Sequence, residues 1–111
     1  MSLAIDKVKP CTSMPDVRRE VDAMDDILVP LLVERVGYMT QAARIKQSAS
    51  QVRDEARIEA IVARVRARAL AEGGDADAME AIYRSLMEVC IAYEHREFER
   101  LREPALAGSA A

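Results

Sequence analysis

The chain has 111 residues and a formal net charge of −3; half of its residues are hydrophobic and 32% are charged. This length predicts a single domain. The composition is too apolar for a disordered chain and too charged for one that lies within a membrane. The acidic balance, with three tyrosines, one phenylalanine and no tryptophan, argues against nucleic-acid binding.

The two cysteines, Cys11 and Cys90, form neither a CxxC pair nor any spacing typical of metal ligands. They predict free thiols in a reducing compartment and no metal site. The first ten residues, MSLAIDKVKP, contain no apolar stretch of signal-peptide length. We therefore expect a cytoplasmic protein that has no membrane partner.

The abundance of Ala, Leu, Glu and Arg, with only four glycines and four prolines, predicts an all-α fold. Residues 1–13 are polar and aperiodic, and are expected to form a flexible tail. A long helix should follow from about Pro15 to Gln47, with Ser13 as its N-cap and a bend at Pro30. Its seam positions recur with alternating gaps of four and three, as in a coiled coil: Val17, Val21, Met24, Leu28, Leu31, Arg35, Tyr38, Ala42 and Ile45.

Two shorter helices follow a polar connector at 48–53. The first is expected over about 54–71, where Gly73 and Gly74 end it. Asp77 and Glu80 have the spacing of a capping pair for the second, which should fade after Leu101. The helical domain thus covers 14–103, and 104–111 should form a flexible C-terminal tail.

A first helix of about 33 residues is about 50 Å long, whereas a compact chain of this size has a radius of gyration near 13 Å. Two short helices cannot cover such a seam well. We expect an intertwined homodimer in which paired long helices complete each other's core. A monomeric three-helix bundle with a bent first helix is the alternative.

Charged residues interrupt the apolar pattern of the long helix. Arg35 takes a seam position, and Lys46 lies eleven residues further on nearly the same face, about 16 Å away, with the small Ala42 between them. Long side chains leaning inward would frame a space suited to a small dianion. The simpler interpretation is that Arg35 reaches solvent or pairs with Glu34 or an acid of a partner.

The other two helices add further charged candidates. Asp54 and Arg57 share one face at the start of the second helix, where a surface ion pair is an equally good interpretation. On the third helix, Glu94 extends an apolar strip that includes Met87 and Cys90. A carboxylate there needs a cationic partner or has to stay protonated. No nucleophile–base pair is evident, so the residues predict a site that binds a small dicarboxylate and stabilises charge on an oxygen.

These residues resemble the all-helical, type II chorismate mutases and the related isochorismate-pyruvate lyases. The resemblance spans about Thr12 to Arg100 and is carried by DVRREVDAMDDILVPLLVER, AARIK, VRDEAR and the stretch around LMEVCIAYE. The phrases CTSMPDVRR and YMTQAARIK are most similar to the lyase branch. Asp54 favours the mutase, because the lyases tend to lose that acid.

The resemblance implies a homodimer with two equivalent sites, each receiving Arg18 across the interface. It implies that Arg18 and Arg35 hold the substrate carboxylates and that Lys46 donates to a carboxylate and the ether oxygen. Arg57 would add to the carboxylate site, Asp54 would accept from the ring hydroxyl, and Glu94 would be a second donor to the ether oxygen. Cys90 stands where relatives often have a small polar contact to substrate. The implied apolar walls are Ala42, Ile61, Met87 and Ile91.

Three functions follow as hypotheses. The first is rearrangement of chorismate to prephenate without a cofactor, by selection of the compact conformer and stabilisation of the ether oxygen. The second is release of pyruvate from isochorismate, which forms salicylate. The third is a non-catalytic helical dimer module whose cations are merely solvated.

Overall fold

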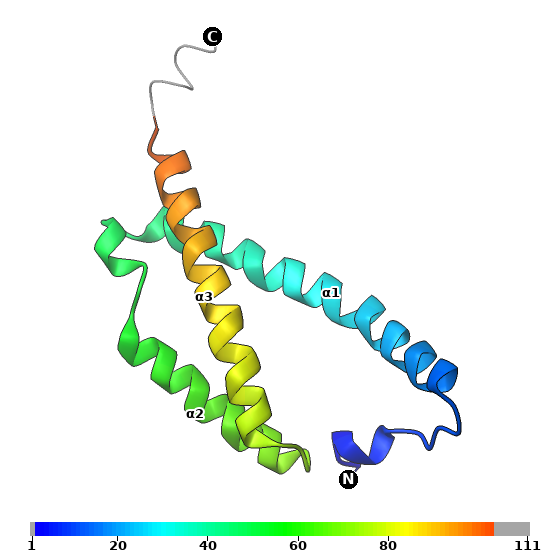
Figure 1. Ribbon diagram of the computed structural model, residues 1–111. Helices are drawn as coiled ribbons and strands as arrows, with labels where there is room; N and C mark the ends of the chain where they lie inside the picture. The colour runs from blue at the N-terminus through cyan, green and yellow to red at the C-terminus, as the bar shows by residue number, and fades with distance from the viewer. Residues whose placement is uncertain (1, 104–111) are drawn as a thin grey trace.

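The computed structural model describes residues 2–103, which form three α-helices and two short 3-10 turns (Figure 1). The helices are α1 (Met14–Ile45), α2 (Glu55–Ala71) and α3 (Ala76–Leu101), and the turns are η1 (Ala4–Lys7) and η2 (Ala49–Gln51). No strand occurs in this range, so the predicted all-α fold is confirmed. The expected C-terminal tail, 104–111, lies outside the described residues. No helix in the described range is both long and apolar enough to cross a membrane.

Each of the three helices has an acidic or hydroxyl side chain as its N-cap. Ser13 caps α1 as expected, its Oγ accepting the backbone N–H of Asp16 at 3.3 Å. Asp54 caps α2, and Asp75 caps α3 by accepting from the N–H of Ala78 at 3.0 Å. The predicted capping pair of Asp77 and Glu80 is therefore wrong: the helix begins two residues earlier than that pair requires.

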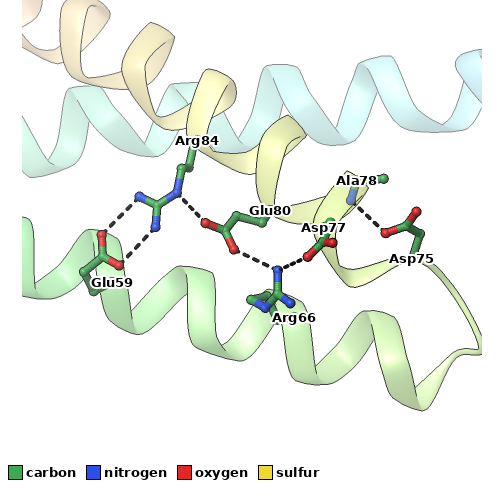
Figure 2. Close-up of polar contacts among 7 residues, drawn as sticks. All are labelled: Glu59, Arg66, Asp75, Asp77, Ala78, Glu80 and Arg84. Atoms are coloured by element: carbon green, nitrogen blue, oxygen red, sulfur yellow. Dashed lines mark hydrogen bonds and ion pairs between the residues drawn. The ribbon is translucent and has the colours of Figure 1, made fainter.

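Asp77 and Glu80 instead belong to an ion network that joins α2 to α3 (Figure 2). Arg66 donates to both of them, at 2.9 and 2.8 Å. Arg84 donates to Glu80 and, through two nitrogens, to both oxygens of Glu59. Hydrogen bonds from Arg84 lower the pKa of Glu59 and of Glu80. Because the network is solvent-exposed, it serves to fix how α2 and α3 pair more than to stabilise the fold.

The core lies between α2 and α3, and the C-terminal half of α1 crosses and packs against α3 (Figure 1). Its buried members are Ile58, Ile61, Val62 and Met87, with Val65, Tyr83 and Ile91 packed against them. The three core residues of α2, Ile58, Ile61 and Val62, have the i, i+3, i+4 spacing that places side chains on one face of a helix. This small core fixes α2 against the middle of α3, which is where the candidate site lies.

The N-terminal half of α1 extends away from the other two helices (Figure 1). The one buried residue of α1 is Ala43, near the C-terminal end of the helix. The seam residues Val21, Met24, Leu28 and Leu31 are between 47% and 60% exposed. The helix continues through Pro30 without a break. The radius of gyration, 18.6 Å, exceeds the roughly 13 Å of a compact chain, as a helix that overhangs its own bundle requires.

Within the segment before α1, where we expected a flexible tail, a short turn is bonded to the end of α2. Residues 4–7 form a 3-10 turn whose backbone is bonded to the end of α2: the N–H of Ala4 donates to a carboxylate oxygen of Glu72 and that of Ile5 to its carbonyl, at 3.0 and 3.1 Å. Ile5 sits against Gly73, where a Cβ would lie 2.5 Å from its Cγ2. Gly73 also has φ +77°, so glycine is required there both to end α2 and to admit Ile5.

Candidate functional site

A cavity of about 390 Å³ opens between the C-terminal half of α1, the beginning of α2 and the middle of α3. Both charged and apolar side chains line it. The residues that line it are Arg35, Met39, Ala42, Lys46, Val52, Asp54, Arg57, Ile58, Ile61, Met87, Cys90, Ile91 and Glu94. Apart from Arg18, every site residue named from the sequence is in this lining.

Arg35 is held in place by two contacts from α3. Its guanidinium carbon lies 5.6 Å from the centre of the Tyr83 ring, a cation–π distance, and its Nη1 lies 3.4 Å from the thiol sulfur of Cys90. Both contacts are weaker than an ion pair, and no carboxylate binds Arg35 within residues 2–103. Arg35 therefore keeps its charge and several N–H donors available for an anion.

Lys46 and Glu94 form the most buried ion pair of the site. The Nζ of Lys46 lies 2.6 Å from a carboxylate oxygen of Glu94, whose side chain is 4% exposed. The same Nζ lies 3.5 Å from the carbonyl oxygen of Val52. Of the two states expected for Glu94, the structure therefore supplies the cationic partner, which offsets the cost of burying the carboxylate.

Asp54 is the N-cap of α2 and is not part of the surface ion pair that was the alternative. One of its carboxylate oxygens accepts the backbone N–H of Arg57 at 3.0 Å, which caps the helix. No side-chain ion pair joins Asp54 and Arg57 in the described structure. The cap fixes Asp54 at the cavity while its second oxygen remains open to a donor such as a ligand hydroxyl.

Arg18 does not reach this cavity within its own chain. It lies on the exposed first part of α1, seventeen residues before Arg35. At about 1.5 Å per residue, the two Cα atoms are about 25 Å apart along the helix. Arg18 therefore cannot contact a ligand that is held by Arg35 of the same chain.

The predicted apolar walls, Ala42, Ile61, Met87 and Ile91, all line the cavity. Sequence reasoning missed Met39, Val52 and Ile58. Met39 lies one turn after Arg35 and so shares its face of the helix. This spacing could have predicted that Met39 lines the site. Ile58 also belongs to the core between α2 and α3, and Val52 lies in a connector that has no periodicity to interpret. No three His, Cys, Asp or Glu side chains gather as metal ligands would in the part of the chain that the structure describes.

The site thus combines three cationic side chains, two carboxylates and an apolar floor, without a nucleophile–base pair in the lining. The sequence profile of the family described as chorismate mutase type II matches residues 17–95. The chain belongs to this chorismate mutase family. The match contains every residue of the cavity lining, and it leaves η1 and the last turns of α3 outside. No curated protein matches the chain.

Proposed function

We propose that this member of the chorismate mutase family rearranges chorismate to prephenate in the cavity between its three helices. The observation that carries the proposal is the convergence of Arg35, Lys46 and Arg57 on one small cavity whose floor is apolar. A cavity lined by both cations and hydrocarbon suits a cyclic dicarboxylate, because its carboxylates and its ring need different surroundings.

The reaction breaks one C–O bond and forms one C–C bond within a single molecule, so it needs neither a base nor a nucleophile. Arg35 and Arg57 hold the carboxylates in the compact conformer, which removes much of the entropic barrier. Negative charge grows on the ether oxygen as the C–O bond breaks. Lys46 donates to that oxygen in a site where little water competes, so it stabilises the transition state more than the ground state.

Glu94 serves as the second donor to the ether oxygen when it carries a proton, because an ionised carboxylate can only accept. Lys46 has three N–H donors, so it can keep its bond to Glu94 while it donates to the substrate. The free oxygen of Asp54 accepts the ring hydroxyl. The Cys90 thiol, already in contact with Arg35, lies beside the bound carboxylate.

The active form is a homodimer in which each copy supplies Arg18 to the other. Two observations support this. The apolar seam of α1 is exposed over its N-terminal half, an arrangement that pairing with a second α1 would relieve. Arg18 lies about 25 Å along the helix from the cavity of its own chain, beyond the reach of its side chain.

Separate incubations of the purified protein with chorismate and with isochorismate test the proposal. We expect loss of chorismate and formation of prephenate. Salicylate and pyruvate from isochorismate as the main products would favour the lyase instead. Lys46→Ala should lower turnover by roughly 10²- to 10³-fold, the range for removal of one preorganised donor. Loss of neither substrate would contradict both enzymes and leave the non-catalytic dimer module.

A further inference from the structure

The last turn of α3 is bonded to the end of α1 through Arg102. Its Nη2 lies 2.5 Å from the carbonyl oxygen of Lys46 and 3.4 Å from that of Arg44. Its Nη1 donates to the carbonyl of Phe98 at 3.3 Å, and its guanidinium carbon lies 3.7 Å from the centre of the Phe98 ring. One side chain therefore connects two helix ends, and its guanidinium group packs against the Phe98 ring.

The end of α1 needs such a donor. The last four carbonyls of an α-helix have no partner within the helix, and they carry the negative end of its dipole. The chain leaves the helix at Lys46, whose ψ is 146°. A guanidinium at this point satisfies two orphan carbonyls and fixes the direction in which the Lys46 backbone turns.

Lys46 is consequently bound to α3 at both of its ends. Arg102 holds its carbonyl, and Glu94, two turns earlier on α3, holds its ammonium group. The family match ends at residue 95, so Arg102 lies outside it whereas Glu94 lies within. Arg102 itself is exposed and does not line the cavity of the candidate site.

We infer that Arg102 is a positioning residue: it fixes the backbone of Lys46 so that the ammonium group projects into the cavity beside Glu94. The effect on kcat that we expect from this positioning rests on the function proposed above. The competing explanation is that Arg102 only stabilises the ends of two helices. The two explanations differ in what happens at the Lys46 side chain once Arg102 is removed.

The chain has only three lysines, Lys7, Lys9 and Lys46, so amine labelling reports on Lys46 against two internal standards. We expect Arg102→Ala to raise the acylation rate of Lys46 several-fold relative to Lys7 and Lys9, as measured by peptide mass spectrometry under limiting reagent. Arg100→Ala is the matched control. It removes the same charge near the end of α3, but in residues 2–103 the side-chain hydrogen bonds of Arg100 go to Glu97 on its own helix and not to the end of α1.

Kinetics supply the second measurement. In Arg102→Ala the displaced ammonium group of Lys46 should donate less well to the ether oxygen. This should lower kcat about tenfold and change KM little, because that contact strengthens in the transition state. Arg102→Lys, which keeps one donor for the Lys46 carbonyl, should recover part of the loss. Arg100→Ala should keep the wild-type kcat.

An unchanged labelling ratio in Arg102→Ala would overturn the inference, even if the variant melts at a lower temperature. Labelling needs no substrate, so it decides the question also for a wild-type protein that turns over neither chorismate nor isochorismate. In that case the proposed function is wrong, and the labelling ratio alone decides whether Arg102 positions Lys46.

Discussion

Asp54 illustrates how one residue can serve the fold and the site at once. One of its oxygens caps α2, and the whole side chain lines the cavity. A simple loss of activity on mutation would therefore be ambiguous. The two roles require different chemistry, since an amide oxygen caps a helix about as well as a carboxylate does but is a weaker acceptor for a hydroxyl.

Substitutions at Asp54 should separate these roles. Asp54→Asn should keep the thermal midpoint near that of wild type and lower kcat/KM for chorismate by about tenfold, the loss expected for one charge-assisted hydrogen bond. Asp54→Ala should lose kcat/KM too and, in addition, about 1 kcal/mol of unfolding free energy. Thermal melts and steady-state kinetics measure the two effects.

Asp75→Ala is the control for the cap, because Asp75 caps α3 in the same way but lines no site. It should lose a similar amount of stability and keep kcat/KM. Wild-type kcat/KM in Asp54→Asn would contradict the assigned role of Asp54 in substrate binding.

Glu94 gives a second prediction at this scale. A carboxyl group donates to the ether oxygen only when it carries a proton, whereas an amide has a permanent N–H donor. Glu94→Gln should therefore turn over chorismate at least as fast as wild type at neutral pH, as measured by kcat. Glu99→Gln, an exposed change on the same helix, should leave kcat unaltered. A large loss of kcat in Glu94→Gln would contradict the assigned role of Glu94 as a donor.

Sequence reasoning located most of the site because its residues break a regular pattern. Arg35 interrupts an apolar seam, and Glu94 extends an apolar strip, so both stand out by periodicity alone. The capping residue of α3 could not be chosen in the same way. Asp75 and Asp77 are both suitable caps, and the choice depends on where the turn after Gly73 allows α3 to begin, which is a tertiary constraint.

At the scale of helices, α1 and α3 are joined by a polar contact above the cavity. The hydroxyl of Thr40 donates to Glu97 at 2.7 Å and lies 3.3 Å from the Tyr93 hydroxyl. Hydrogen bonds from Arg100 and Thr40 lower the pKa of Glu97 to about 2. Glu97 thus favours the folded state most when it is ionised.

This shift predicts how acid affects the helix pair. The lowered pKa of Glu97 means that its stabilisation is complete above its ordinary value of 4.5 and is lost as pH falls toward about 2. Glu97→Gln should therefore melt below wild type at neutral pH, with the gap closing between those limits. Melting temperatures against pH measure this. Glu99→Gln should follow wild type throughout, and a constant gap for Glu97→Gln would contradict the prediction.

The helix boundaries were largely predictable, whereas the first segment was not. Ser13, Gly73 and the seam spacing each determine structure through nearby residues. The helix boundaries could therefore be predicted from the local sequence. The segment at 4–7 is ordered by Glu72 and Gly73, almost seventy residues away. Nothing in its own residues signals that contact, because a short 3-10 turn has no periodicity to recognise.

At the scale of the whole molecule, α1 is too long for the bundle that carries it. Its seam was predictable from the sequence as a pattern, but most seam residues are exposed and do not line the cavity. Arg35 and Ala42 are the seam members that turn into the cavity. The same helix thus builds a site with its C-terminal half and offers an apolar surface with its N-terminal half.

Complementation between inactive variants tests whether that surface brings a second Arg18 to the site. Arg18→Ala and Arg35→Ala should each be inactive alone. A dimer formed from one copy of each has one site with both arginines intact and one with neither. Equal amounts, unfolded and refolded together, should therefore recover roughly a quarter of wild-type activity, because half of the dimers are mixed and each has one working site.

The expected recovery depends on exchange of whole subunits, so each variant refolded by itself is the control and should stay inactive. Leu28→Glu introduced into both variants should abolish the recovery, since it places a carboxylate in the exposed seam of α1. Val89→Glu, on the exposed side of α3 away from Met87, should leave the recovery intact. If Arg18 acted within its own chain, each mixed dimer would have two damaged sites, and mixing would restore nothing.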